Sequence, residues 1–163
     1  MERLITRMGF IMIIVGLMGL SNTAFAKGTD KEYYDLYDAV SNYIPVYSED
    51  LSDIGWNGYY DTIDEYMVIA TGLDDDQWWD TFIHETIHVI QDCKNITEGL
   101  TIFDTNLFQS NAQDNDPQGY SDVAWFALGY DVEAYDVEFE AEYIARYSNI
   151  SYIQSPFDIN CKG

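Results

Sequence analysis

The chain has 163 residues, which favours one domain, and it carries 29 acidic against 7 basic side chains for a net charge of −22. This balance excludes nucleic acid and anionic membranes as expected partners, because both select a basic surface. Aromatic residues make up 16% of the chain, enough to build a packed core despite the charge.

The first segment, residues 1–26, has the organisation of a signal peptide. Arg3 and Arg7 precede the apolar run "GFIMIIVGLMGL", and "SNTAFA" then ends in an Ala-x-Ala pattern. We expect cleavage after Ala26, leaving a single mature domain over 27–163 that is secreted or periplasmic and keeps no stable membrane anchor. The alternative is an uncleaved anchor, for which the apolar run is short.

Three elements are expected before the middle of the chain. Apolar positions at helical spacing predict a helix over 30–44, with Asp30 as its N-cap. The Ser-, Asp- and Gly-rich stretch 47–62 predicts a loop or a short hairpin. The β-rich "EYMVIAT" predicts a strand over 65–71.

The most regular pattern follows, in "LDDDQWWDTFIHETIHVIQDC", residues 73–93. A continuous apolar stripe predicts an amphipathic helix, and Asp74 or Asp75 can cap it. The polar segment 94–120 predicts a connection with at most one short helix, around residues 100–108.

The remaining chain divides into a helix and a tail. Residues 121–147 predict a helix with a break near Gly129, and 148–163 predict an irregular tail. Together, these patterns indicate an α+β domain that is mainly helical, with a small β element.

Two cysteines, Cys93 and Cys161, are present. In an exported protein an even pair predicts one disulfide, which here ties the end of the 73–93 helix to the C-terminus. Cys93 as a metal ligand is the less favoured alternative, because nine residues place it near the opposite helix face from His84.

The chain has two histidines, His84 and His88, and both lie in "HETIH". On a helix their side chains project from nearly the same face and can share one Zn²⁺. Glu85 is rotated by about 100° from His84, where it can reach a water beside the metal as a general base. The alternative is a pair of structural histidines at the border of a packed helix.

A catalytic zinc takes a third protein ligand, and no histidine remains to supply it. A carboxylate is the expected donor, and a thiolate is the less favoured one. The segment "EFEAEYIARY" resembles the second motif of the gluzincins, zinc peptidases with a glutamate as third ligand. By that resemblance Glu138 is the ligand and Glu142 orients a histidine, although Glu142 stands where aspartate is usual.

Two alternatives stay open in this segment. Glu140 is the second candidate for the third ligand, because a break near Gly129 can rotate the helix. Glu142 and Arg146 can also form an ordinary surface pair at i, i+4 spacing.

The whole string "HETIHVIQDC", including Gln91 and Cys93, is similar to a group of small bacterial and phage His-Glu-x-x-His-x-x-Gln proteins. This likeness implies a zincin-like core. A tyrosine would stabilise the oxyanion, and Tyr130, Tyr135 and Tyr143 are the candidates. The strand at 65–71 would be an edge that pairs with an extended peptide.

These expectations combine into an exported zinc-dependent peptidase acting on a peptide or protein substrate. His84, His88 and Glu138 would hold Zn²⁺, and Glu85 would be the base. The alternative is a non-catalytic zinc-binding module with a structural or partner-binding role. A metal-free helical interaction protein is a third, weaker hypothesis.

Overall fold

The computed structural model describes residues 28–94 and 135–162 together with positions 121, 123, 124, 127 and 129. This part of the chain is α+β and mainly helical, as predicted. It contains α1 (Asp30–Ser41), β1 (Val46–Glu49), β2 (Gly58–Asp61), β3 (Tyr66–Ala70), α2 (Asp75–Cys93), α5 (Tyr135–Tyr147) and α6 (Ile150–Asn160). The predicted signal peptide 1–26 and the predicted short helix 100–108 lie outside the described residues.

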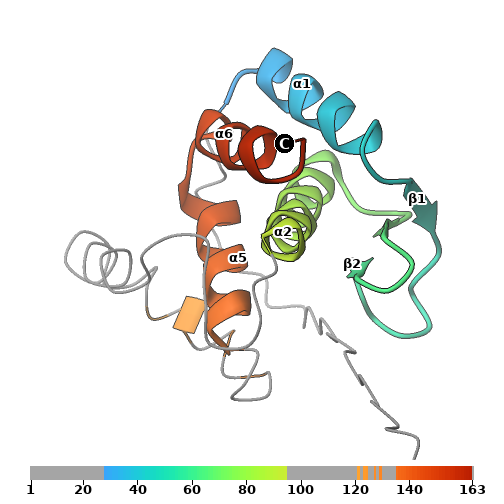
Figure 1. The fold of residues 1–163 in the computed structure, drawn as a ribbon. Helices are drawn as coiled ribbons and strands as arrows, with labels where there is room; N and C mark the ends of the chain where they lie inside the picture. The colour runs from blue at the N-terminus through green and yellow to red at the C-terminus, as the bar shows by residue number, and fades with distance from the viewer. Residues whose placement is uncertain are drawn as a thin grey trace, which may run out of the picture.

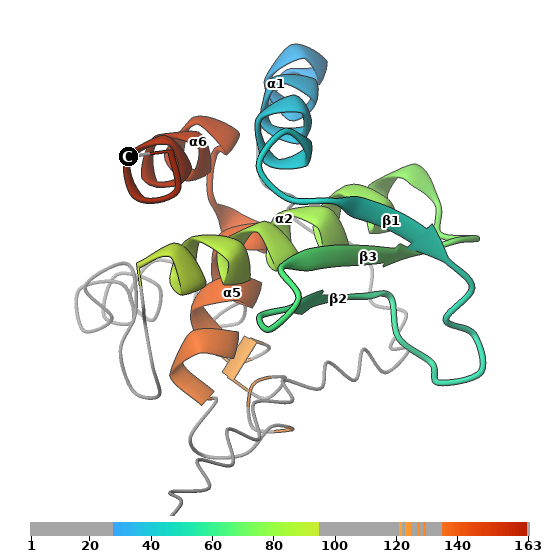
Figure 2. The same cartoon turned by 45° about the vertical axis from the view of Figure 1, so that its right-hand side comes forward.

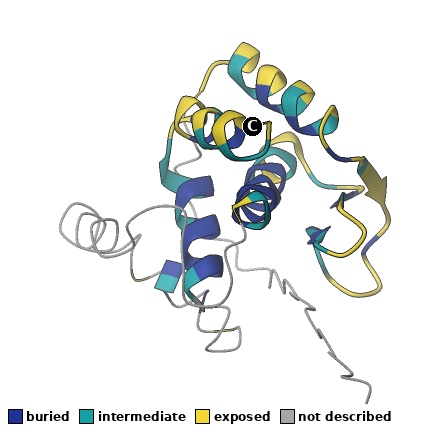
Figure 3. Cartoon of the chain, viewed as in Figure 1, coloured by how far each residue is buried: buried dark blue, intermediate teal, exposed yellow. Residues whose placement is uncertain are grey.

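Helix α2 is the centre of the fold (Figures 1 and 2). One side of α2 packs against β2 and β3, and the other packs against α5 and α6. Every residue from Thr81 to Gln91 is buried, which is visible as the dark core of Figure 3. A helix covered on all sides is a core helix, so polar groups within this stretch need partners inside the protein.

The N-cap of α2 is the one predicted from the sequence, whereas the N-cap of α1 is not. Asp74 caps α2, and its carboxylate accepts from the Gln77 N–H in a capping box. The predicted N-cap of α1 at Asp30 is wrong, because Thr29 caps the helix and Glu32 completes another capping box. Because the Thr29 hydroxyl and the Glu32 carboxylate form this box, the N-cap of α1 lies one residue before the predicted position.

The three strands form a mixed sheet in the order β1-β3-β2. β1 pairs with β3 in parallel, and β2 pairs with β3 in antiparallel fashion. The expectation of a loop over 47–62 is confirmed for residues 50–57, whereas the short hairpin is wrong, because the strands on either side of this loop pair with β3 and not with each other. The predicted strand at 65–71 is confirmed as β3, but it is the central strand and not an edge.

Gly58 allows β2 to lie close to α2. A Cβ atom at this position would lie 2.6 Å from Cγ2 of Thr81 and 2.8 Å from the carbonyl oxygen of Val68. No ordinary side chain fits at these distances. The Tyr60 hydroxyl, one step along the same face of β2, donates a 2.9 Å hydrogen bond to Asp92 near the end of α2. β2 is thus fixed to α2 at two points.

The C-terminal region contains a further correction. Gly129 lies in a turn before α5, in agreement with the predicted break. The tail expected to be irregular instead forms α6, whose Ile150, Ile153 and Phe157 are buried. Their i, i+3, i+7 spacing places them on one helix face, and its burial outweighs the hydrogen bond that Pro156 removes.

The predicted disulfide between Cys93 and Cys161 is confirmed. It joins the last residue of α2 to the residue that follows α6, across a sequence separation of 68. A covalent link over so long a loop restricts the unfolded chain, which stabilises the folded state by about 4 kcal/mol in the chain-entropy model.

We expect the double variant Cys93→Ala/Cys161→Ala to lose about 4 kcal/mol of unfolding free energy. Urea unfolding at neutral pH measures this loss. Reductant should destabilise the parent protein and leave the double variant unchanged. Equal unfolding midpoints for oxidised parent and double variant would contradict the expected contribution.

Candidate metal centre

Two imidazoles on the buried face of α2 form one side of the candidate site. His84 and His88 are 5% and 4% exposed, and their Nε2 atoms lie 3.1 Å apart. The four-residue spacing places both rings one helical turn apart on the same side of α2. This side faces α5.

Glu138 of α5 forms the other side. Its carboxylate is fully buried, and its oxygens lie 3.4 Å from Nε2 of His84 and 3.6 Å from Nε2 of His88. One ligand atom from each of the three residues falls within 4.8 Å of the others, so the group could hold a metal ion. The structure thus brings together the three predicted ligands from two separate helices.

The orientation of His88 is fixed by Gln91, one turn further along α2. The Gln91 amide nitrogen donates to Oε2 of Glu140 at 2.9 Å and to the carbonyl of Val137 at 3.1 Å. The amide oxygen of Gln91 must then accept the 2.7 Å bond from Nδ1 of His88. His88 therefore carries its proton on Nδ1, and the Nε2 lone pair faces the site.

His84 is oriented in the same sense by Glu142. Oε2 of Glu142 lies 3.2 Å from Nδ1 of His84, and a carboxylate can only accept from that nitrogen. Glu142 also forms an ion pair with Arg146. The predicted i, i+4 pair of Glu142 and Arg146 therefore exists, but it is not an ordinary surface pair, because Glu142 is only 6% exposed and also contacts the imidazole of His84.

These contacts create an electrostatic problem that a cation resolves. With both Nδ1 atoms donating outward, two Nε2 lone pairs face each other beside the Glu138 carboxylate. Neither oxygen of Glu138 accepts a hydrogen bond of good geometry within the structure. A bound metal ion would satisfy all three groups at once, since neutral imidazole and carboxylate are metal donors. The residues therefore fit a metal, and no property of the donor set fixes its identity.

The same crowding perturbs the protonation of these groups. Burial alone would lower the pKa of His84, but its contacts with Glu138 and Glu142 outweigh burial and hold the pKa well above its ordinary value. Burial opposes the ionisation of Glu138, and His88 and His84 overcome it and lower the pKa of Glu138 to about 2. Without a metal, a proton is the cation that the site attracts.

Glu85 differs from Glu138 in what surrounds it. It is 1% exposed, and neither of its oxygens has a hydrogen-bond partner of good geometry. Burial raises the pKa of Glu85 to about 7, against the opposing charges of His84 and His88 and the nearby peptide group of Tyr60. A carboxyl that exchanges its proton near neutral pH is suited to acid–base chemistry.

Glu140 was the second candidate for the third metal ligand. Glu140 does not join the metal group, because it accepts from Gln91. The hydrogen-bonding role of Gln91 was missed from the sequence. The His-x-x-Gln spacing of "HVIQ" carried the signal, since residues three apart on a helix are neighbours.

Of the three tyrosine candidates for oxyanion binding, Tyr143 is the one whose side chain the structure describes. Tyr143 stacks on Phe139 at 6.0 Å and lies 4.9 Å from the ring of Tyr147, so its ring packs in a separate apolar cluster. Tyr130 and the side chain of Tyr135 lie outside the described residues.

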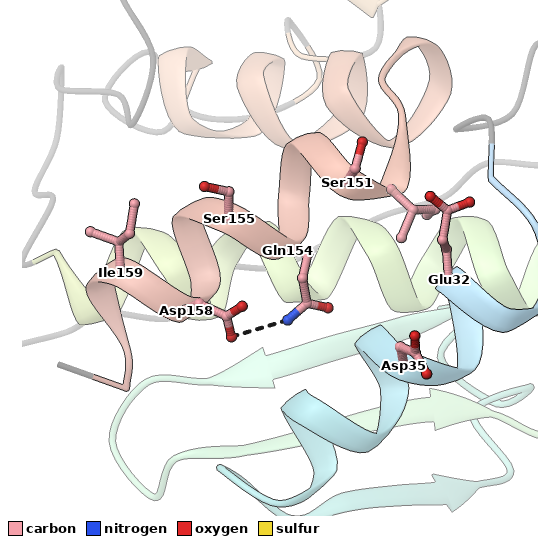
Figure 4. A pocket seen from close by; sticks show the side chains of 8 residues that line it. Glu32, Asp35, Ser151, Gln154, Ser155, Asp158 and Ile159 are labelled. Atoms are coloured by element: carbon pink, nitrogen blue, oxygen red, sulfur yellow. Dashed lines mark hydrogen bonds between the residues drawn. The ribbon is translucent and has the colours of Figure 1, made fainter.

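A hollow of about 340 Å³ between α1 and α6 is separate from this centre (Figure 4). The carboxylates that line it already have partners. Glu32 accepts hydrogen bonds from the backbone N–H and hydroxyl of Thr29, and Asp35 pairs with Lys31. Asp158 accepts from Gln154 and pairs with Lys162. The hollow contains none of the residues of the metal group.

Comparison with known proteins adds no assignment: no family model, no curated protein and no solved structure matches the chain.

We expect Glu85→Gln to stabilise the metal-free protein more at pH 8 than at pH 5. The folded pKa of about 7 exceeds the ordinary 4.5, so the unfolded state releases this proton first as pH rises. The carboxyl therefore destabilises the fold progressively from about pH 4.5 to 7, by about 3 kcal/mol in total.

Urea unfolding in chelator at the two pH values measures the difference. Glu49→Gln, on the exposed strand β1, is the matched control and should change either value by less than about 0.5 kcal/mol. An equal effect of Glu85→Gln at both pH values would show that Glu85 is not held protonated by the fold.

Proposed function

We propose that the protein is a zinc-dependent peptidase with His84, His88 and Glu138 as the metal ligands. The observation that carries the proposal is the convergence of two lone pairs and an unsatisfied buried carboxylate beside a second buried carboxylate, Glu85. Two histidines and a glutamate form a donor set of catalytic zinc sites, which leave a coordination position open. The resemblance of the two motifs to gluzincins agrees with this assignment.

Each residue has a defined task in the proposed reaction. Zinc supplies Lewis acidity, which lowers the pKa of a water molecule to about 7. The Glu85 carboxylate accepts the proton of the attacking water and then donates it to the leaving amine. Gln91 and Glu142 hold the imidazoles in the tautomers that ligate a metal.

Strand β2 supports a peptide substrate in particular. Ala70 donates to the carbonyl of Asn57, and the register places Gly58 opposite Ile69 and Tyr60 opposite Met67. Hydrogen-bonded pairs alternate along an antiparallel ladder.

The peptide groups of Gly58 and Tyr60 consequently point away from β3, and that of Tyr60 lies near Glu85. A peptide that adds to this edge would run past the proposed base.

An exported setting is part of the proposal. The expected signal peptide and the disulfide both suit an oxidising compartment. No helix among the described residues could cross a bilayer.

Burial of the site favours one second candidate function. Every member of the metal group is at most 5% exposed, as expected of an ion that fastens α2 to α5. The protein would then be a zinc-binding module in which the metal is structural. Chelation would unfold such a module, whereas a catalytic site would lose activity and keep its fold.

The identity of the third ligand is tested with a matched pair of variants. We expect purified protein to bind about one zinc per chain. Glu138→Gln should abolish this binding, because it removes the anionic donor that faces both imidazoles. Glu140→Gln, two residues away, should keep stoichiometric zinc, since an amide can still accept from Gln91. Elemental analysis after gel filtration measures both, and zinc retained by Glu138→Gln would contradict the ligand assignment.

The peptidase proposal itself is tested with Glu85→Gln. This variant should retain zinc and the parent circular-dichroism spectrum, and lose peptide cleavage by at least about 100-fold, because the base is gone. A library of quenched fluorescent peptides provides the assay. Cleavage that is unaffected by the substitution would exclude the proposed mechanism. A parent that binds zinc, cleaves nothing and unfolds in chelator would favour the structural module.

A further inference from the structure

A second hollow, of about 320 Å³, lies between α1 and the first turns of α2. Four aromatic rings and one carboxylate line it: Tyr34, Tyr37, Trp78, Trp79 and Asp75. Tyr34 is 61% exposed, and the other rings are half-buried. This aromatic lining differs from the lining of the hollow between α1 and α6, which contains no aromatic ring, and the proposed peptidase chemistry does not use it.

The four rings that line the hollow, called the cage below, are linked to one another by ring–ring contacts. Trp78 and Trp79 meet at 87° with centroids 4.9 Å apart, and Tyr34 meets Trp79 at 84° and 5.6 Å. Tyr37 is inclined to Trp78 at 53°. Phe82 stacks on Trp78 at 10° from the core side, so that the cage is supported from behind.

The charge around the hollow is negative. Asp75 lines it, Asp76 follows Asp75 in the first turn of α2, and the N-cap Asp74 precedes it. Three carboxylates outweigh the helix dipole, which is equivalent to about half a positive charge at this end. Within the described part of the chain, the cation found over a ring is Lys162, which lies over Phe157 and not over this cage.

We propose that this cage binds a small soluble molecule with a trimethylammonium group, of the choline type. Aromatic faces attract cations through the ring quadrupole, and a quaternary ammonium gives up little hydration when rings enclose it. Asp75 adds charge complementarity at the rim. The volume lies at the lower end of the range for small-ligand pockets, which suits a compact ligand.

The cage and the metal centre are separate in space. Trp78 and Trp79 precede His84 by six and five residues, so they project about 120° and 140° away from it around α2. A ligand in the cage would therefore not contact the metal group. Binding can be measured without any assumption about catalysis.

The test is a titration of the purified full chain, followed by the indole N–H signals of Trp78 and Trp79 in two-dimensional NMR. We expect saturable shifts with tetramethylammonium and with choline. The neutral tert-butyl analogue of choline should bind at least about tenfold more weakly, because it has the same shape and no charge.

Variants localise the binding. Tyr34→Leu should weaken choline binding about tenfold, and Asp75→Asn about threefold at low salt, because each removes one attractive wall. Tyr47→Leu and Asp64→Asn are matched controls, since both positions are exposed and lie outside the cage. Both controls should bind as the parent does.

Four results would overturn the proposal. They are no saturable shift with either ammonium compound, equal affinity for the neutral analogue, parental affinity in Tyr34→Leu, and binding of a trimethyllysine peptide without binding of choline. Because the exposed side chains chosen for substitution are not part of the core, parental melting temperatures should confirm that every variant is folded.

Discussion

The structure depends on one electrostatic constraint, the meeting of two imidazole nitrogens and a carboxylate between two core helices. Burying a carboxylate is costly unless its charge is balanced. Here His84 and His88 from α2 face Glu138 from α5, and Gln91 directs a ring lone pair inward. The packing of α2 against α5 is therefore conditional on a positive charge at their interface, whether a proton or a metal ion supplies it.

A steric constraint on the opposite side of α2 is as important for the fold as this electrostatic one. The close contact at Gly58 lets β2 lie against α2, and the hydrogen bond from Tyr60 to Asp92 fixes β2 to the C-terminal end of α2. The outward peptide groups of β2 then lie next to Glu85. The absence of a side chain at Gly58 and the hydroxyl group of Tyr60 thus hold the sheet, α2 and Glu85 in one geometry.

The sequence predicted local features of the molecule well. The helix over 73–93 and the strand near 65–71 follow from hydrophobic periodicity, and the pairing of cysteines from their number. The sequence could not reveal which strand is the sheet edge, because β1 and β2 both pair with β3 through tertiary contacts. It missed α6, whose Ser, Asn and Pro residues concealed a buried apolar face. Propensity is a weak guide where burial decides.

The disulfide has a consequence for how the third ligand is delivered. Cys93 follows the histidines, and the bond to Cys161 closes a covalent ring that contains Glu138 but neither imidazole. The two cysteines that close this ring, Cys93 and Cys161, are both held at the end of α2. When α5 separates from α2, the closed loop lets Glu138 sample a smaller volume around the two imidazoles than the reduced chain would, so the centre reassembles at a lower cost in chain entropy.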